Sequence, residues 1–202
     1  MYFVSFDLLK QDIVLIKNNV TLVPLTFEHL KELTEICKSG DFGKIRTTST
    51  PHFTDVNSYI EKALNQKDKG IRYPFAVLES SSNQLIGTTS YHDIIHTAKR
   101  LEIGNTWYKP ESQRTHVNTT CKYLLFKYAF EILKANTVGL RADIFNFKSQ
   151  KAIERLGIQK DGVIRGNAVR KDGTIRDTVM YSVVAGEWEN IKAHLKYLLD
   201  SY

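Results

Sequence analysis

Residues 101–133 read LEIGNTWYKPESQRTHVNTTCKYLLFKYAFEIL, and this stretch decides the fold class. The segment from Arg100 to Tyr108 alternates in residue type in the way that favours a strand. After a polar loop, apolar residues recur at helical spacing at Val117, Cys121, Leu124, Tyr128 and Ile132. A long helix whose apolar stripe faces a core is therefore predicted soon after the strand.

Upstream of this stretch, turn-forming residues divide the chain into short segments. Each segment is bounded by a turn, a capping residue or a glycine, as the ends of regular elements require. The expected elements are a hairpin over 12–25, a helix over 26–40, a helix capped by Thr54 or Asp55, and strands over 73–79 and 84–94. Because the turns between the strands are short, an antiparallel meander is predicted.

Downstream, the same signals predict a second group of strands and helices. They are a strand over 138–142, a helix over 149–156 closed by Gly157, strands over 163–169 and 174–184 joined at Asp172-Gly173, and a helix over 187–199. This order predicts an α/β (α+β) fold in which helices flank a mixed, mostly antiparallel sheet.

The composition is typical of one soluble domain spanning residues 1–202. Hydrophobic residues make up 42% and charged residues 25% of the chain. Cys37 and Cys121 form no CxxC pair, so a reducing cytoplasm is expected and a disulfide framework is not. The apolar start, Met1 to Leu9, contains Asp7 and lacks the features of a signal peptide. No apolar run reaches the roughly 20 residues that a membrane-spanning helix needs.

The formal net charge of +6 favours either simple solubility or an anionic ligand. Nucleic acid and a phosphorylated cofactor are the two anionic candidates. The basic residues are scattered rather than clustered, which argues against nucleic acid as a partner.

Several short motifs follow one another in the second half of the chain. They are Leu101-Glu102-Ile103-Gly104 with Trp107 and Pro110, Asn146-x-x-Ser149, Glu154-Arg155-Leu156-Gly157, Asp161-Gly162-Val163-Ile164-Arg165 and Gly173-x-x-Arg176-Asp177. In this order and spacing, residues 12–190 resemble the GCN5-related N-acetyltransferase (GNAT) superfamily. The branch that the chain resembles most is that of the ribosomal-protein N-terminal acetyltransferases.

This resemblance implies a GNAT fold, acetyl-coenzyme A (acetyl-CoA) as the acetyl donor, and an amine as the acceptor. Two neighbouring parallel strands are expected to splay apart, here residues 100–108 and 138–143, with the pantetheine arm between them. By resemblance, Asn146 contacts that arm, and Ser149 lies near the thioester sulfur and can protonate the leaving thiolate. Both residues could instead serve only as local caps of a strand end and a helix start. A monomer or a homodimer is expected.

The loop before the long helix departs from the family's phosphate-binding pattern, Gln/Arg-x-x-Gly-x-Gly/Ala. Residues 113–118 read QRTHVN, so His116 and Asn118 stand at the glycine positions. Both residue types tolerate left-handed backbone better than most, so a modified loop is expected. A helix N-terminus offers N–H groups and a partial positive charge to phosphate oxygens. Pyrophosphate contacts are therefore expected at Gln113, Arg114, Thr115, His116, Val117, Asn118 and Thr119.

Cationic side chains near this loop have two interpretations. Arg114 and Lys122 could add positive charge to the phosphate site. Each could equally be an ordinary solvated side chain.

Amine acetylation requires a base, oxyanion donors and an acid for the thiolate. Glu102 is the candidate base, acting through a water, although a solvated side chain or an ion pair with Arg100 is the alternative. By family analogy, backbone N–H groups of Asn105, Thr106 and Trp107 would hold the oxyanion. The alternation places side chains on opposite strand faces, with Glu102, Gly104, Thr106 and Tyr108 on one and Leu101, Ile103 and Trp107 on the core side.

Other residues are weaker candidates for chemistry. His92 and Asp93 end a strand near the expected acceptor cleft, and Tyr91 or Tyr108 could act as acids. The six histidines show no metal-binding spacing, so no metal is expected.

Two other classes of function remain open from the sequence. A catalytically silent acyl-CoA sensor would explain the missing glycines, and a nucleic-acid-binding protein would use the positive charge. The acceptor amine is not identified by the sequence: a protein N-terminus and a small-molecule amine both fit.

Overall fold

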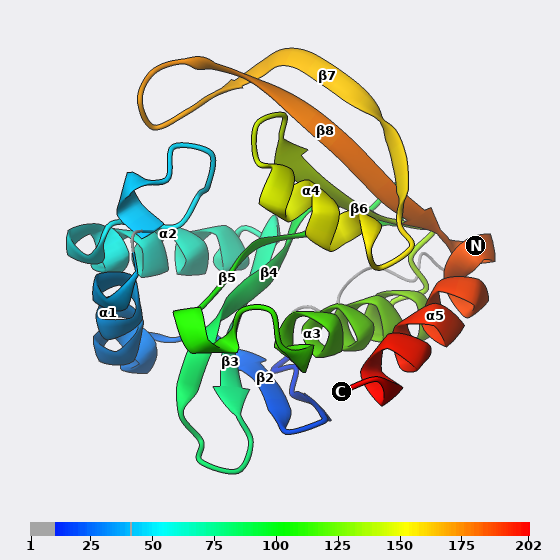
Figure 1. Ribbon diagram of the computed structural model, residues 1–202, viewed down its shortest axis with the longest axis horizontal. Helices are drawn as coiled ribbons and strands as arrows, with labels where there is room; N and C mark the ends of the chain where they lie inside the picture. The colour runs from blue at the N-terminus through cyan, green and yellow to red at the C-terminus, as the bar shows by residue number, and fades with distance from the viewer. Residues whose placement is uncertain (1–10, 41) are drawn as a thin grey trace.

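A mixed sheet forms the centre of the structure, a computed structural model that describes residues 11–40 and 42–202. Within these residues the sheet has eight strands in the order β1-β2-β3-β4-β5-β6-β8-β7 (Figure 1). The strands are β1 (Leu15–Lys17), β2 (Val20–Pro24), β3 (Arg72–Glu79), β4 (Leu85–Ile95), β5 (Arg100–Tyr108), β6 (Thr137–Asp143), β7 (Gln159–Val169) and β8 (Ile175–Val184). Neighbouring strands are antiparallel except β5 and β6, which are parallel. The predicted sheet is confirmed.

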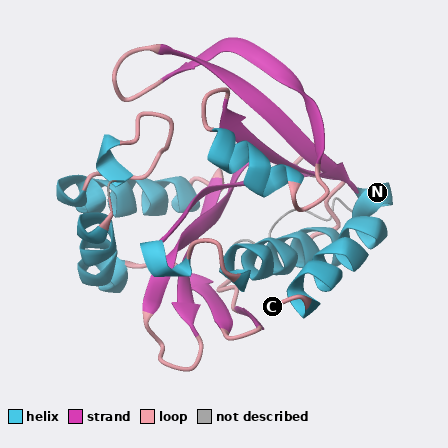
Figure 2. Ribbon diagram, viewed as in Figure 1, coloured by secondary structure: helices cyan, strands magenta, loops and turns pink. Residues whose placement is uncertain are grey.

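Helices lie on both faces of the sheet (Figure 2). They are α1 (Leu30–Ser39), α2 (Val56–Asp68), α3 (His116–Lys127), α4 (Phe147–Glu154) and α5 (Trp188–Asp200). A π-helical turn, Tyr128–Ile132, extends α3. None of the described helices is both long and apolar enough to cross a membrane. The segment Met1 to Leu9, interpreted above as unlike a signal peptide, lies outside the described residues.

Two hydrophobic clusters show which helices cover which face. Leu33 of α1 and Trp107 of β5 belong to one cluster, beneath α1 and α2. Phe126 of α3 and Leu195 of α5 belong to the other, on the opposite face of the sheet.

The start of the second helix differs from the predicted one in its capping hydrogen bond. A 3₁₀ turn, Phe53–Asp55, precedes α2. The side chain of His52 accepts the capping hydrogen bond, from the backbone N–H of Thr54. Asp55 borders α2 but makes no side-chain cap. Asp55 is therefore at the cap position of α2, as predicted, but the capping hydrogen bond is made one turn earlier, by His52.

The parallel strands β5 and β6 form the expected splayed pair. They pair only from Arg100 to Glu102 on β5 and from Thr137 to Gly139 on β6. Beyond these three residue pairs, β6 continues along β8, while β5 continues along β4. A wedge therefore opens between β5 and β6 toward the N-terminus of α3.

A bulge interrupts β5 at the wedge. Between the pairs Ser90–Gly104 and Thr88–Trp107, β5 has two residues where β4 has one. Asn105, the first of the two, has a φ of 50°, a left-handed conformation that asparagine tolerates better than most residues.

The bulge also changes the faces on which the last residues of β5 lie. Trp107 packs in the cluster beneath α1 and α2, whereas Tyr108 packs with Leu101 and Ile103 on the opposite face. The predicted alternation is therefore wrong for Trp107 and Tyr108, because one extra residue reverses the parity of everything after it.

Candidate active site

The bulge in β5 leaves backbone groups free beside the wedge. Asn105 and Thr106 have no register partners on β4. The hydroxyl of Thr106 lies 2.7 Å from that of Thr89 and accepts a hydrogen bond from Lys122 Nζ at 3.1 Å. An unpaired strand backbone at this point can offer N–H donors to a carbonyl oxygen, as expected for residues 105–107.

The N-terminus of α3 lies at the open end of the wedge and is ordered by a cap. Thr115 has an extended backbone, and its hydroxyl accepts a hydrogen bond from the N–H of Val117 at 3.3 Å. The left-handed residue of this loop is Arg114, with a φ of 62°. His116 and Asn118 lie inside α3. The expectation that these two replace glycines in a left-handed conformation is therefore wrong, because the loop makes its turn at Arg114.

The side chains of His116 and Asn118 have partners within the protein. His116 Nε2 lies 3.0 Å from the carbonyl oxygen of Asn18, in the β1–β2 turn. The amide oxygen of Asn118 accepts a long hydrogen bond from Tyr108 at 3.4 Å. Both side chains are thus used in packing the helix against neighbouring elements.

Polar side chains cross the wedge mouth between β5 and α4. Gln113 donates to the carbonyl oxygen of Tyr108 at 3.0 Å and accepts from Lys148 Nζ at 2.6 Å. Arg155 donates to the hydroxyl of Thr119 at 2.7 Å. With the exposed Arg114, this end of the wedge is rich in positive charge.

Lys122 differs from these cations because it is almost completely buried. Only 4% of its surface is exposed, and burial lowers the pKa of its ammonium to about 8. Its hydrogen bond to Thr106 places the amine beside the bulge rather than in solvent.

Asn146 and Ser149 begin α4 at the end of β6. The side chain of Asn146 accepts a hydrogen bond from the N–H of Ser149 at 3.1 Å and donates to the carbonyl oxygen of Thr47 at 3.3 Å. Asn146 is therefore the cap, and α4 begins at Phe147, two residues earlier than predicted. The cap interpretation of Asn146 is confirmed and that of Ser149 is wrong. Their roles toward acetyl-CoA stay predictions.

A cavity of about 270 Å³ opens beside the bulge, on the α2 side of the sheet. Its wall includes Asn105, His92, Asp93 and Arg72. Arg72, His92 and Glu102 lie directly opposite one another on β3, β4 and β5. Directly opposite residues share a face, so this row of charged and polar side chains underlies the cavity.

Glu102 lies fully buried within an ion-pair network. Its two carboxylate oxygens accept from Arg100 Nη2 at 2.8 Å and from Arg141 Nε at 2.6 Å. Burial alone would raise the pKa of Glu102, but the hydrogen bonds and positive charge of the arginines outweigh burial and lower it. Gly139 permits this packing, because a Cβ there would lie 2.9 Å from Glu102 Cγ.

His92 and Asp93 complete the network at the cavity. His92 Nδ1 lies 3.2 Å from Asp93 Oδ2, and Arg141 also donates to that oxygen. The hydrogen bond from His92 is the main cause of the lowered pKa of Asp93. His92 Nε2 faces the backbone at Gly104, where a Cβ would lie only 2.2 Å away. Glycine at 104 therefore leaves room for the Nε2 edge of the imidazole beside the bulged strand.

His92, Asp93 and Glu102 offer ligand atoms within 4.8 Å of one another, a spacing that would suit a metal ion. Arg100 and Arg141 already occupy both oxygens of Glu102, and Arg141 also binds Asp93. These guanidinium groups supply the positive charge that would otherwise come from a cation. The cluster is better described as an ion-pair network than as a metal centre.

Sequence reasoning missed two arginines and overrated two tyrosines. Arg72 and Arg141 gave no signal as isolated basic residues, although the β3–β4–β5 register would have placed Arg72 beside His92. Tyr91 donates to the carbonyl oxygen of Leu125 in the core, and Tyr108 is also buried. Burial raises the pKa of both phenols well above the ordinary value, so neither is placed to act as an acid near neutral pH.

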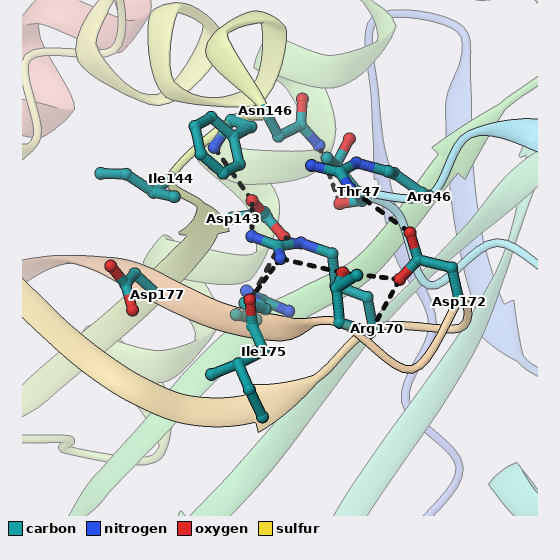
Figure 3. A network of polar contacts seen from close by, with 12 residues as sticks. Arg46, Thr47, Asp143, Ile144, Asn146, Arg170, Asp172, Ile175 and Asp177 are labelled. Carbon is teal, nitrogen blue, oxygen red and sulfur yellow. Dashed lines mark hydrogen bonds and ion pairs between the residues drawn. The ribbon is translucent and has the colours of Figure 1, made fainter.

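A second polar network lies at the carboxyl end of β6, between the α1–α2 loop and the β7–β8 hairpin (Figure 3). Asp143, at the end of β6, binds Arg170 through both carboxylate oxygens, at 2.6 and 3.0 Å. Arg46, from the α1–α2 loop, reaches Asp172 in the β7–β8 turn at 3.4 Å. The α1–α2 loop is thereby attached to the long hairpin that arches over α4 (Figure 1).

Comparisons with known proteins agree with this geometry. Residues 19–159 match the family model described as "Acetyltransferase (GNAT) domain". The Bacillus subtilis protein named "Putative ribosomal N-acetyltransferase YdaF" is 33% identical over 108 residues, which cover 54% of this chain and 58% of that protein. The "Uncharacterized N-acetyltransferase YoaA" of the same organism is 30% identical over 122 residues, 60% of this chain and 67% of the relative.

A solved structure shows the same fold over nearly the whole chain. The crystal structure of a GCN5-related N-acetyltransferase from Brucella melitensis superposes with a TM-score of 0.84 and 25% sequence identity. The superposition covers 94% of this chain and 86% of that one.

Proposed function

The chain belongs to the acetyltransferase (GNAT) family, and on this basis we propose that it transfers an acetyl group from acetyl-CoA to an amine. The observation that carries the proposal is the position of the β5 bulge. At Asn105 the bulge borders both the β5–β6 wedge, where a thioester arm would lie, and the cavity that holds His92. Donor and acceptor can therefore meet at one point of the sheet.

The residues around the wedge fit acetyl-CoA as the donor. The unpaired N–H groups at the start of α3, together with Arg114 and Lys148, suit the pyrophosphate. Asn146 would turn its amide to the pantetheine arm, and the backbone at residues 105–107 would hold the thioester oxygen. Ser149 is half-buried at the start of α4, where its hydroxyl could protonate the departing thiolate.

The amine attacks the thioester directly after losing a proton to a base. Glu102 is the expected base, but it is fully buried and held by two arginines, and its low pKa weakens it as a proton acceptor. His92 lines the cavity, and the carboxylates of Asp93 and Glu102 lie beside it. We therefore propose that His92 accepts the proton and that Glu102 and Asp93 position it.

Two classes of acceptor amine fit the site. The similarity to a protein named as a ribosomal N-acetyltransferase supports a protein N-terminus, and the small cavity supports a small amine. The hypothesis of a catalytically silent sensor rested on the missing glycines of the phosphate-binding loop. It is weakened, because His116 and Asn118 occupy helical positions that do not require a left-handed glycine.

Release of free coenzyme A thiol from acetyl-CoA, measured across a panel of amines, tests the proposal. Amine-dependent thiol release and acetylated product are expected. Tight binding of acetyl-CoA with no product from any peptide or small amine would instead favour the sensor.

A further inference from the structure

A buried arginine without an acidic partner lies in the wall of the acceptor cavity. Arg72 is only 5% exposed. Its Nε donates to Ser90 at 2.9 Å, its Nη2 to Tyr59 at 2.7 Å, and its Nη1 to Gln66 at 3.5 Å. All three partners are neutral, and no carboxylate of the described residues forms an ion pair with it.

This arrangement leaves both charge and hydrogen-bonding capacity unused. A guanidinium has five N–H donors, and the three neutral partners account for three of them. Burying an uncompensated charge costs several kcal/mol, so a buried arginine usually has an acidic partner. The neutral partners fix the orientation of Arg72, with its guanidinium stacked 5.0 Å from the Tyr59 ring centre, but do not neutralise it.

The position of Arg72 relates this charge to the proposed reaction. Arg72 and His92 are opposite residues on neighbouring strands, which lie about 5 Å apart. Lys62 of α2 adds a second cation to the same wall. Asp93, which lines the cavity, and Glu102, which is buried beneath it, are already paired with arginines. The α2 side of the cavity therefore carries net positive charge.

We propose that the acceptor is a small amine bearing an anionic group, a carboxylate or a phosphate, which binds Arg72 while the amine lies at His92. This inference rests on the proposed acetyl transfer and specifies its substrate class. The cavity of about 270 Å³ lies just below the range of roughly 300–1,000 Å³ typical of drug-sized ligands. It suits a compact molecule whose two charged ends are a few bonds apart. The same chemistry occurs at the start of a peptide with an acidic first residue.

Matched pairs of amines that differ only in the anionic group test the proposal. The pairs are phosphoethanolamine with ethanolamine, β-alanine with its amide, and a peptide beginning Asp with one beginning Asn. The readout is kcat/KM for thiol release, as the ratio of the anionic to the neutral member. The wild-type ratio should exceed that of Arg72→Gln by about 10-fold or more, as expected for a hydrogen bond between charged groups.

Comparing ratios between variants cancels intrinsic differences in amine reactivity. Arg165→Gln, an exposed residue of β7, makes the same charge change away from the cavity and should keep the wild-type ratio. A wild-type enzyme without preference for anionic members, or an Arg72→Gln variant that retains the preference, would overturn the proposal. A preference confined to the peptide pair would overturn the small-amine assignment and indicate an acidic peptide.

Two further measurements keep the test decisive. If Arg72→Gln does not fold, Lys62→Gln replaces it and should reduce the ratio, because Lys62 is exposed and its loss is tolerated. Melting temperatures of wild type and variant with each amine, in the presence of coenzyme A, report binding without turnover. Stabilisation by anionic members that depends on Arg72, without thiol release, would retain the anion site and contradict acetyl transfer. The absence of both stabilisation and thiol release would contradict the anion site and acetyl transfer alike.

Discussion

At the scale of single residues, the structure favours His92 over Glu102 as the catalytic base, the reverse of the order that the sequence indicated. His92 lines the cavity, whereas Glu102 is sealed beneath it by Arg100 and Arg141. Loss of a general base lowers turnover by about 10²–10⁴-fold. His92→Gln should therefore lower kcat by that factor, flatten the acidic limb of the pH–rate profile and leave acetyl-CoA affinity unchanged. Near-normal turnover with an unchanged profile would exclude His92 as the base.

Glu102→Gln is the variant to compare with His92→Gln, because its main effect should be on stability rather than on turnover. Removing one member of a buried ion pair costs about 3–5 kcal/mol. The pKa of Glu102 is lowered in the folded state, so its stabilisation is present above the ordinary value of 4.5 and is lost as the pH falls through the folded value. The difference in unfolding free energy between wild type and variant should shrink in acid. A fully stable variant with greatly reduced turnover would return the catalytic role to Glu102.

Lys122 predicts an alkaline change in stability of the opposite kind. Burial lowers its pKa from 10.5 to about 8, so between these values the unfolded chain binds the proton and the folded chain does not. The free energy of unfolding of the wild type should therefore rise as the pH increases from about 8 to about 10.5. Lys122→Met should be more stable than wild type at pH 7, by an amount that shrinks toward pH 10 in urea unfolding. A stability difference between the two proteins that does not change with pH would contradict the lowered pKa of Lys122.

At the scale of elements, the N-terminus of α3 allows one backbone donor to be removed without breaking the helix. His116 is the first residue of α3, a position where proline is favoured, and Thr115 before it is extended, as proline requires. His116→Pro should weaken acetyl-CoA binding by roughly 10-fold, the effect of one hydrogen bond to a charged group. His116→Ala loses the same side chain but keeps the N–H. Equal affinities of the two variants, measured by calorimetry, would place the pyrophosphate elsewhere.

The same scale shows where sequence reasoning succeeds and where it ends. Alternation and turn residues predicted the meander and the β7–β8 hairpin, because each depends on local backbone preference. The parallel wedge was expected only from the resemblance to the GNAT superfamily, since the pairing of β5 with β6 is long-range. The bulge at Asn105 was not predicted from the sequence. The residues LEIGNTWY still look like a regular strand, and the extra residue is seen only in the pairing of β5 with β4. The contacts of Arg72 and Arg141 depend on strand register, which isolated residues do not reveal.

At the scale of the whole molecule, the wedge divides the sheet into two halves whose strands are paired over a short stretch. Between β5 and β6 only three residue pairs are in register. Glu102 and Arg141 connect the halves at the closed end, and Arg46 with Asp172 connects them across the α1–α2 loop. The acceptor cavity belongs to the first half and α4 to the second, so a ligand in the wedge would contact both. The single-domain organisation stays a prediction.

The most direct test of the central claim is a crystal structure of the protein with acetyl-CoA bound. The account predicts the pantetheine arm between β5 and β6 and the pyrophosphate at residues 114–119. It also predicts the thioester oxygen about 3 Å from a backbone N–H of residues 105–107, with the acetyl group facing the His92 cavity. Acetyl-CoA bound outside the wedge, or with its thioester turned away from the bulge, would contradict the account.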